Sequence, residues 1–247
     1  MSWIMDALDI WLGFTQPYAR LEVAQAGFEA DRVMDYCPCC GSSVGRGEVH
    51  VWKDRLCCTE CRYRVHAVSR VIRLGPYCSP LRPWILQIKF HRWEPLAKEL
   101  GRCLAQQVRD RYRQQAEAMV VVPIPMSPWR HLVRGIDHTH ILAQAVAKEL
   151  GAPLERPLSV RWGCSRRPQA GLSSSLRRRM PATRWRLSKR LVGTIRNRHI
   201  LLIDDVLTTG ATLNTAAGAM RAASPRSITA AVLAVSDRGR GGAKISK

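Results

Sequence analysis

The sequence contains no apolar run that approaches the ~18 residues needed to span a bilayer. It also lacks the cationic start of a secretory signal, because no Lys or Arg precedes Arg20, and Asp6 and Asp9 interrupt the first apolar residues. Its 247 residues, 46% of them hydrophobic, suffice for one or two domains at roughly 150 residues each. We therefore expect a globular cytoplasmic protein without a membrane span.

Acidic residues are scarce. The chain has 19 Asp and Glu against 39 Lys and Arg, a formal net charge of +20. Residues 1–36 form an acidic leader with six acids and two Arg, so the excess positive charge lies beyond it. Such a field attracts nucleic acid, acidic lipid headgroups or phosphorylated metabolites, and charge alone does not choose among them or exclude a merely basic surface.

The nine cysteines are unevenly placed, and six of them lie in two clusters. Each cluster contains a Cys-x-x-Cys pair: Cys37 and Cys40, then Cys58 and Cys61. Seventeen residues separate the pairs, a spacing typical of a four-thiolate zinc site with no open coordination position. The sequence thus predicts a structural zinc module over residues 37–66, with Cys39, Cys57 and His66 open as alternative ligands.

From residue 119 onward, short apolar runs alternate with helical patterns. Strands are expected at 119–122, 200–203 and 228–235, and helices at 141–150 and 213–223. Before them, Pro83 and Pro95 each fit the first turn of a helix within residues 79–117. This alternation predicts an α/β domain with a mostly parallel central sheet.

One expected strand runs into an unusual loop. Residues 200–203, Ile-Leu-Leu-Ile, lead into Asp204 and Asp205, then Val-Leu-Thr-Thr-Gly-Ala-Thr at 206–212, then a helix. In α/β folds the carboxyl end of a strand is where ligands bind. Loop amides, Thr hydroxyls and the helix N-terminus favour a phosphate, while carboxylates accept hydrogen bonds from sugar hydroxyls. The alternative is an acidic helix cap with chance threonines.

This string resembles the signature with which type I phosphoribosyltransferases bind 5-phosphoribosyl-1-pyrophosphate (PRPP). The resemblance implies that fold, a Mg²⁺ requirement, and ribose-orienting, catalytic roles for Asp204 and Asp205. It implies a phosphate cradle formed by Thr208, Thr209, Gly210, Ala211 and Thr212. The loop after the first strand of that fold contacts pyrophosphate, which implies roles for Pro123, Ile124, Arg130 and Arg134.

The whole architecture resembles the ComF/GntX family of competence-type proteins. Four segments carry this resemblance beside the cysteines and the PRPP loop: residues 81–90, 121–125, 134–135, and 169–172 with Arg177. Departures lie at 136–138, where Ile-Asp-His replaces Phe-Asn-Gln, at Met180 and at 92–93. The expected organisation is a leader at 1–36, the zinc module at 37–66, a phosphoribosyltransferase-like domain at 79–236 and a basic tail at 237–247.

Residues 156–199 contain twelve Arg and one Lys but no Asp or Glu. Cations neutralise a phosphate backbone and indoles stack on unpaired bases, so this composition fits single-stranded DNA. The candidate contacts are Trp162, Arg166, Arg167, Arg177, Arg178 and Arg179. The resemblance agrees, since ComF-type proteins are associated with DNA uptake, although the same arginines could bind pyrophosphate instead.

The leading hypothesis is a Mg²⁺-dependent transferase that acts on PRPP in natural transformation, with other competence proteins as partners. The rival is a component that binds PRPP and single-stranded DNA without turnover. No general base is identified; Asp137 and His138 are candidates by position only, and both suit an ordinary helix start. The acceptor substrate is not readable from the sequence.

Overall fold

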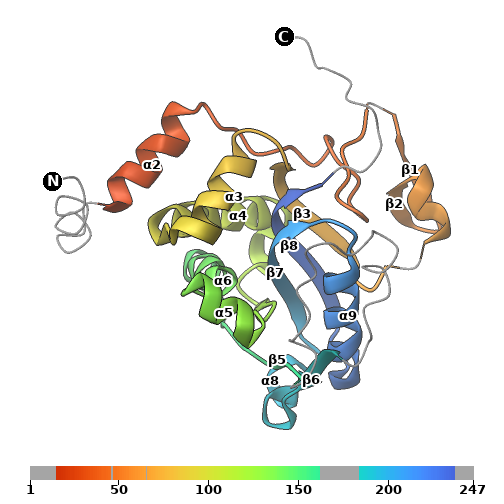
Figure 1. The fold of residues 1–247 in the computed structure, drawn as a ribbon. Coiled ribbons are helices and arrows are strands. Elements are labelled where there is room, and N and C mark those ends of the chain that lie inside the picture. The colour runs from red at the N-terminus through yellow and green to blue at the C-terminus, as the bar shows by residue number, and fades with distance from the viewer. Residues whose placement is uncertain (1–14, 46, 65, 162–183, 237–247) are drawn as a thin grey trace, which may run out of the picture.

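A computed structural model describes residues 15–45, 47–64, 66–161 and 184–236 (Figure 1). The strands in these ranges are β1 (Val49–Trp52), β2 (Arg55–Cys58), β3 (Arg70–Pro76), β4 (Val120–Pro123), β5 (Leu158–Val160), β6 (Trp185–Leu187), β7 (His199–Leu207) and β8 (Ser227–Val235). The helices are α2 (Thr15–Gln25), α3 (Leu81–His91), α4 (Glu94–Tyr112), α5 (Pro128–Arg134), α6 (His138–Leu150), α8 (Val192–Ile195) and α9 (Ala211–Met220). Short 3₁₀ turns connect some of them.

The central sheet has four strands in the order β3-β8-β7-β4, and every neighbouring pair is parallel. Parallel neighbours require crossover connections, and α9 lies in the one between β7 and β8. Helices α3 and α4 lie in the connection between the two edge strands, β3 and β4. The predicted α/β class with a mostly parallel sheet is therefore confirmed.

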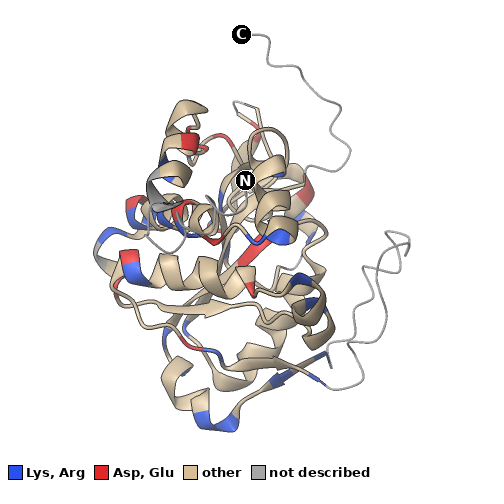
Figure 2. Cartoon of the chain, turned by 60° about the vertical axis from the view of Figure 1, so that its left-hand side comes forward, with Lys and Arg blue, Asp and Glu red and all other residues tan. Residues whose placement is uncertain are grey.

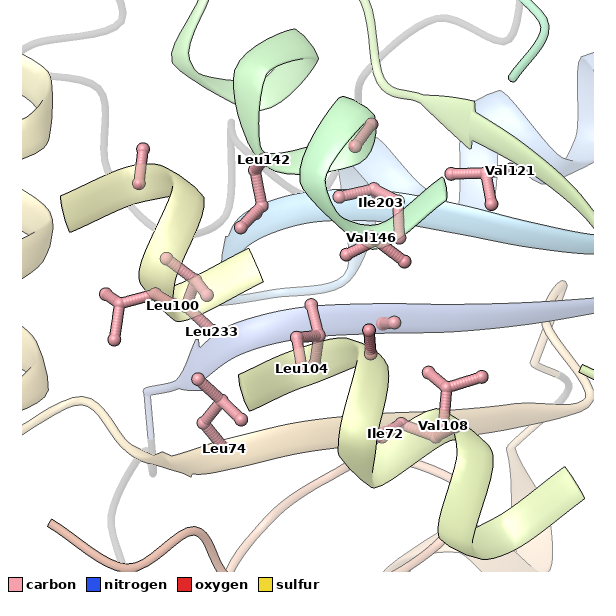
Figure 3. Packing of buried hydrophobic residues seen from close by; sticks show 14 of the residues in the cluster. Ile72, Leu74, Leu100, Leu104, Val108, Val121, Leu142, Val146, Ile203 and Leu233 are labelled. Carbon is pink, nitrogen blue, oxygen red and sulfur yellow. The ribbon is translucent and has the colours of Figure 1, made fainter. Parts of the chain in front are cut away.

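Both faces of this sheet are covered, which explains why its strands are apolar almost without interruption. Along β7, Leu201 and Ile203 pack in the cluster that contains α4 and α6, as Figure 3 shows for Ile203. The alternate residues, Ile200 and Leu202, pack in the cluster that contains α9. Alternation along one strand thus builds two cores, with helices on either side of the sheet (Figure 1).

The predicted helices are present with shifted ends. Pro83 and Pro95 lie in the first turns of α3 and α4. Helix α6 begins three residues earlier than expected, because Asp137 caps it by accepting a hydrogen bond from the His140 amide at 3.1 Å. Gly151 ends it at φ 66°, a left-handed conformation that favours glycine.

Within the central sheet, two strands differ most from expectation. Strand β7 continues past Ile203 to Leu207, since β8 still pairs with it there, so the acidic pair lies inside the strand. Strand β3 was not predicted, because Arg73 interrupts its apolar pattern. Arg73 is nonetheless only 1% exposed.

The cysteine module lies against the outer edge of β3. Within this module, β1 forms an antiparallel hairpin with β2. The loop that holds Cys37 and Cys40 pairs with the sheet, because the Val71 amide donates to the Pro38 carbonyl at 2.8 Å. On the opposite edge, Val121 of β4 exchanges hydrogen bonds with the 153–155 segment. Both edges of the central sheet are therefore covered.

The N-terminal part of the described chain packs on the helical layer. The Trp84 indole of α3 donates to Glu22 of α2 at 2.9 Å, and its ring meets Phe28 edge-on. Residues 1–14 of the acidic leader lie outside the described residues. Among those that are described, no helix combines the length and apolarity needed to cross a membrane.

Candidate ligand-binding site

A cavity of about 330 Å³ opens at the carboxyl end of β7, beside the start of α9. Its polar lining includes Lys89, Ser127, Arg130, Arg134, Asp204 and Asp205. These side chains come from α3, the β4–α5 connection, α5 and β7, so residues more than 100 positions apart meet here. The position agrees with the rule that ligands of α/β sheets bind beyond the carboxyl strand ends.

The first carboxyl of the acidic pair, Asp204, is held by its neighbour. The Asp205 amide donates to Asp204 Oδ1 at 2.9 Å. Burial, together with the charge of Asp205, raises the pKa of Asp204 to about 7. Asp204 therefore takes up a proton more readily than an ordinary carboxyl and, when protonated, can donate as well as accept hydrogen bonds.

The second carboxyl, Asp205, has two cationic or donor neighbours on the same oxygen. Lys89 Nζ lies 2.8 Å and His138 Nε2 lies 2.7 Å from Asp205 Oδ2. Burial alone would raise the pKa of Asp205, but the Lys89 charge and the His138 hydrogen bond outweigh it and lower that pKa. The adjacent acids therefore differ: one stays ionised, while the other titrates near neutrality.

His138 is the first residue of α6 and is 3% exposed. Because a carboxylate only accepts, Nε2 must carry the proton that it shares with Asp205. His138 Nδ1 has no hydrogen-bond partner among the described residues. The guanidinium of Arg134 lies 3.3 Å from Nε2 and, being a donor itself, does not bond to a protonated Nε2. His138 thus orients Asp205, and it also lines the cavity.

Only part of the predicted phosphate cradle lies at the cavity. Thr208 and Thr212 line it, together with Asp204 and Asp205. Thr209 instead accepts a hydrogen bond from the Ala211 amide at 3.3 Å, and Gly210 and Ala211 are not among the lining residues. Gly210 adopts φ 76° as the N-cap of α9, which explains the need for glycine at that point.

Of the residues predicted to contact pyrophosphate, Ile124, Arg130 and Arg134 line the cavity. Pro123 does not, because it is the last residue of β4 and is buried opposite Ile203 of β7. Ser127 caps α5 by accepting a hydrogen bond from the Arg130 amide at 3.4 Å. This cap fixes the short helix whose two arginines reach the cavity.

Sequence reasoning did not assign Lys89 to the site, and it named His138 only as an uncertain base. Lys89 looked like one of many cations on a helix, and only the tertiary fold brings α3 against β7. The signal was present but weak: Lys89 falls in the segment 81–90 that resembles the ComF/GntX pattern.

The four predicted zinc ligands form a compact group away from this cavity. The sulfurs of Cys37, Cys40, Cys58 and Cys61 all lie within 4.8 Å of one another. Tetrahedral zinc–sulfur bonds of about 2.3 Å require sulfur separations of about 3.8 Å, and the Cys37–Cys61 and Cys40–Cys58 pairs are both 4.0 Å apart. The group could therefore hold zinc. Cys39 points elsewhere, because its thiol contacts the Leu56 carbonyl at 3.2 Å.

The predicted nucleic-acid contacts lie outside the described residues: Trp162, Arg166, Arg167, Arg177, Arg178 and Arg179. The second indole of the arginine-rich stretch, Trp185, is described and is 5% exposed. Its Nε1 donates to Thr215 of α9 at 3.0 Å. Trp185 is thus largely buried in the core, and part of it lines the cavity.

A family model described as the phosphoribosyl transferase domain matches residues 138–247. The chain is 29% identical over 186 residues to the DNA utilization protein YhgH of Escherichia coli O6:H1, covering 72% of this chain and 74% of that protein. It is 28% identical over 181 residues to Competence protein F of Haemophilus influenzae, covering 72% and 75%.

Solved structures of phosphoribosyl-transfer enzymes are also similar. A hypoxanthine phosphoribosyl transferase of Trypanosoma cruzi matches with a TM-score of 0.39 and 20% identity, covering 60% of this chain and 69% of that one. The glutamine PRPP amidotransferase of B. subtilis matches with a TM-score of 0.37 and 22% identity. That match covers 55% of this chain and spans only 25% of the amidotransferase.

The family match begins at His138 and includes β7 with the acidic pair and α9, which are among the elements that form the cavity. The relatives named for DNA utilization and competence confirm the ComF/GntX resemblance. The chain has the type I phosphoribosyltransferase fold, its residues 138–247 match the phosphoribosyl transferase domain model, and its sequence is similar to those of YhgH and Competence protein F.

Proposed function

We propose that this chain binds PRPP at the carboxyl end of β7 and transfers its phosphoribosyl group with release of pyrophosphate, as part of DNA uptake or utilization. One observation carries the proposal. One cavity is lined both by Asp204, Asp205, Thr208 and Thr212 and by the two arginines of α5, Arg130 and Arg134. Acceptors for sugar hydroxyls and donors for phosphates therefore surround a single space.

Each part of PRPP has a chemical match in this cavity. The ribose hydroxyls would donate to the acidic pair. The 5-phosphate would accept hydrogen bonds at the start of α9, where Thr208 and Thr212 add hydroxyls and the helix adds a favourable dipole. The diphosphate would lie toward Arg130 and Arg134, whose guanidinium groups suit two-pronged contacts with phosphate oxygens.

The donor set also fits Mg²⁺. Carboxylate oxygens beside a site for phosphate oxygens are the hard ligands that Mg²⁺ prefers, so Asp204 would hold it together with the substrate. When bound, the ion would neutralise charge on the diphosphate leaving group.

In the transfer, the bond between C1 and the diphosphate oxygen breaks, and its electron pair leaves with pyrophosphate. An acceptor nucleophile, for example a ring nitrogen, donates an electron pair to C1. Positive charge develops on the ribose ring between these events, where the ionised Asp205 favours it by electrostatics. Arg130 and Arg134 would stabilise the departing negative charge.

A specific observation favours the rival function, in which PRPP is bound without turnover. The two candidate bases are already engaged: His138 bonds to Asp205, while Asp137 caps α6 and pairs with Arg156 at 3.3 Å. Both side chains thus already hold contacts within the protein. A binding component of DNA uptake would need no such base.

Pyrophosphate release separates the two functions. The full chain is incubated with Mg²⁺ and PRPP, with and without nitrogen bases or oligonucleotides. Release that disappears in Asp204→Asn and Asp205→Asn, but persists in the exposed control Asp110→Asn, supports the transferase. PRPP binding without release, sensitive to the same substitutions, supports the binding component. Absence of PRPP binding refutes both.

We propose that the arginine-rich stretch, residues 156–199, binds single-stranded DNA. Lys and Arg are spread over helices, strands and loops of the described chain rather than confined to one element (Figure 2). Overall charge therefore does not locate the DNA surface. Replacing Arg177, Arg178 and Arg179 with Gln should weaken oligonucleotide binding and reduce its salt dependence. An unchanged salt slope would contradict this assignment.

We further propose a structural zinc in the cysteine module, a cytoplasmic location and the division into leader, module, domain and tail set out above. The zinc proposal rests on the sulfur geometry, which leaves no coordination position for a substrate.

A further inference from the structure

Lys89 reaches the acidic pair from a different layer of the fold. It lies in the last turn of α3, whose buried residues Ile85 and Ile88 anchor the helix in the core. Its ammonium lies 2.8 Å from Asp205 Oδ2, and both side chains are only 14% exposed. The lysine thus occupies the carboxylate that a ribose would need.

A ribose hydroxyl that uses Asp205 Oδ2 competes with Lys89, because this oxygen already accepts from both Lys89 and His138. A largely buried ammonium that loses its acceptor is left unsatisfied, which strongly opposes binding. Ribose binding that takes Oδ2 is therefore favourable only if the ligand offers Lys89 a new acceptor nearby.

The charges around the cavity indicate what that acceptor is. Lys89 lines the cavity together with Arg130 and Arg134, on the side proposed for the diphosphate. A diphosphate at C1 of the sugar would provide anionic oxygens in place of the carboxylate. Ribose 5-phosphate has only a hydroxyl at C1 and cannot compensate the lysine in this way.

His138 keeps the carboxylate in place during such an exchange. Its Nε2 donates to the same oxygen at 2.7 Å, and its 3% exposure leaves it little freedom to move. Asp205 would thus remain oriented toward the sugar after the lysine moves.

We propose that Lys89 is a specificity-determining residue: it pairs with Asp205 in the free protein and moves onto the diphosphate of the ligand. It thereby makes the site select a ribose that carries a diphosphate over ribose 5-phosphate. This inference rests on the proposed function. It adds the residue that discriminates between the two ligands.

The test measures two affinities in the full chain. Isothermal titration with Mg²⁺ gives the dissociation constants for PRPP and for ribose 5-phosphate. In Lys89→Met, PRPP affinity should fall tenfold or more, on the order of one lost charged hydrogen bond. Ribose 5-phosphate should bind equally well or more tightly, because no lysine must be displaced. Lys89→Arg should restore part of the preference for PRPP.

The control is Lys98→Met on α4, which removes the same charge from a position 46% exposed. It should leave the ratio of the two affinities unchanged. If Lys89→Met melts below the assay temperature, Lys89→Gln provides the same comparison with a side chain that can still donate to Asp205.

The outcomes distinguish failure of the proposed function from failure of the role proposed for Lys89. If the parent chain binds no PRPP, the proposed function fails and the inference fails with it. If the parent binds PRPP, but Lys89→Met weakens both ligands equally or neither, Lys89 is only structural. The specificity role is then overturned while the proposed function stands.

Discussion

The guanidinium of Arg73 lies 2.6 Å from the carboxylate of Asp31, although Arg73 belongs to a strand of the central sheet and is 1% exposed. The same guanidinium donates to the Gly41 carbonyl at 2.6 Å and to the Ser43 hydroxyl at 2.8 Å. One side chain thus connects the N-terminal segment, the cysteine loop and β3. This connection explains why a cation interrupts an otherwise apolar strand.

Replacing Arg73 with Met should destabilise the chain by about 3 kcal/mol or more, since Asp31 and the Gly41 carbonyl lose a charged donor. Chemical denaturation measures the change. Arg32→Met is the matched control, because its ion pair with Asp35 is exposed and should contribute less than about 1 kcal/mol. Equal effects of the two substitutions would contradict the role assigned to Arg73.

Zinc content should distinguish the four cysteines of the compact group from their neighbours. Cys58→Ser removes one of four thiolates and should abolish stoichiometric zinc, together with a large fall in the melting temperature. Cys57→Ser changes the adjacent buried thiol and should leave the metal bound. Full metal content in Cys58→Ser, measured by mass spectrometry, would refute the predicted ligand set.

Replacing either acid of the pair with Asn should change the stability of the chain, and we expect the two changes to have opposite signs. A carboxyl whose pKa is raised from 3.8 to about 7 keeps its proton in the folded state after the unfolded chain has lost it. Unfolding then releases a proton, so Asp204 makes stability fall as pH rises from about 4 to about 7, by a few kcal/mol. Asp204→Asn should therefore gain stability relative to the parent between pH 5 and pH 8.

Asp205 behaves in the opposite way, because its pKa is lowered in the folded state. Its contribution is present above the ordinary pKa of 3.8 and is lost only in stronger acid. Asp205→Asn should destabilise the chain by about 3 kcal/mol near neutral pH, since it leaves the Lys89 ammonium without its carboxylate. Thermal melts of both variants across pH test this pair; parallel curves would contradict the assignment.

Gly210 should tolerate no side chain without strain. A Cβ there would meet no atom closer than 3.5 Å, so the penalty comes from the backbone at φ 76°. Gly210→Ala should cost about 1 kcal/mol of stability and weaken PRPP binding, because relaxation of the loop moves the start of α9. Gly218→Ala, in the middle of α9 with open space around it, should be neutral or slightly stabilising.

The parts of the site that follow one another in the chain were predictable from the sequence. Asp204, Asp205 and the Thr-rich loop form a continuous string, and local rules place them after a buried strand and before a helix. The cysteine group was predictable for the same reason, since fixed spacing within each pair constrains its geometry. Lys89 and His138 were not, because their contact with Asp205 depends on how α3 and α6 pack across the sheet.

The extent of the strands depended on pairing rather than on composition. The apolar run 200–203 indicated a strand but not its continuation through two acids to Leu207, which exists because β8 offers a partner as far as Val235. Strand β3 was not predicted because Arg73 interrupts its apolar pattern, and an arginine is expected at the surface unless its buried partners are known. Both differences arise from contacts distant in sequence.

The Val71–Pro38 hydrogen bond has a consequence for handling the protein without metal. In the intact chain, the cysteine loop shields one border of the parallel sheet from other molecules. If chelation unravels that loop, unpaired amides and carbonyls of β3 become accessible to a second chain. Demetallated samples should then self-associate through this strand, so precipitation on chelator treatment would reflect lost shielding rather than global unfolding.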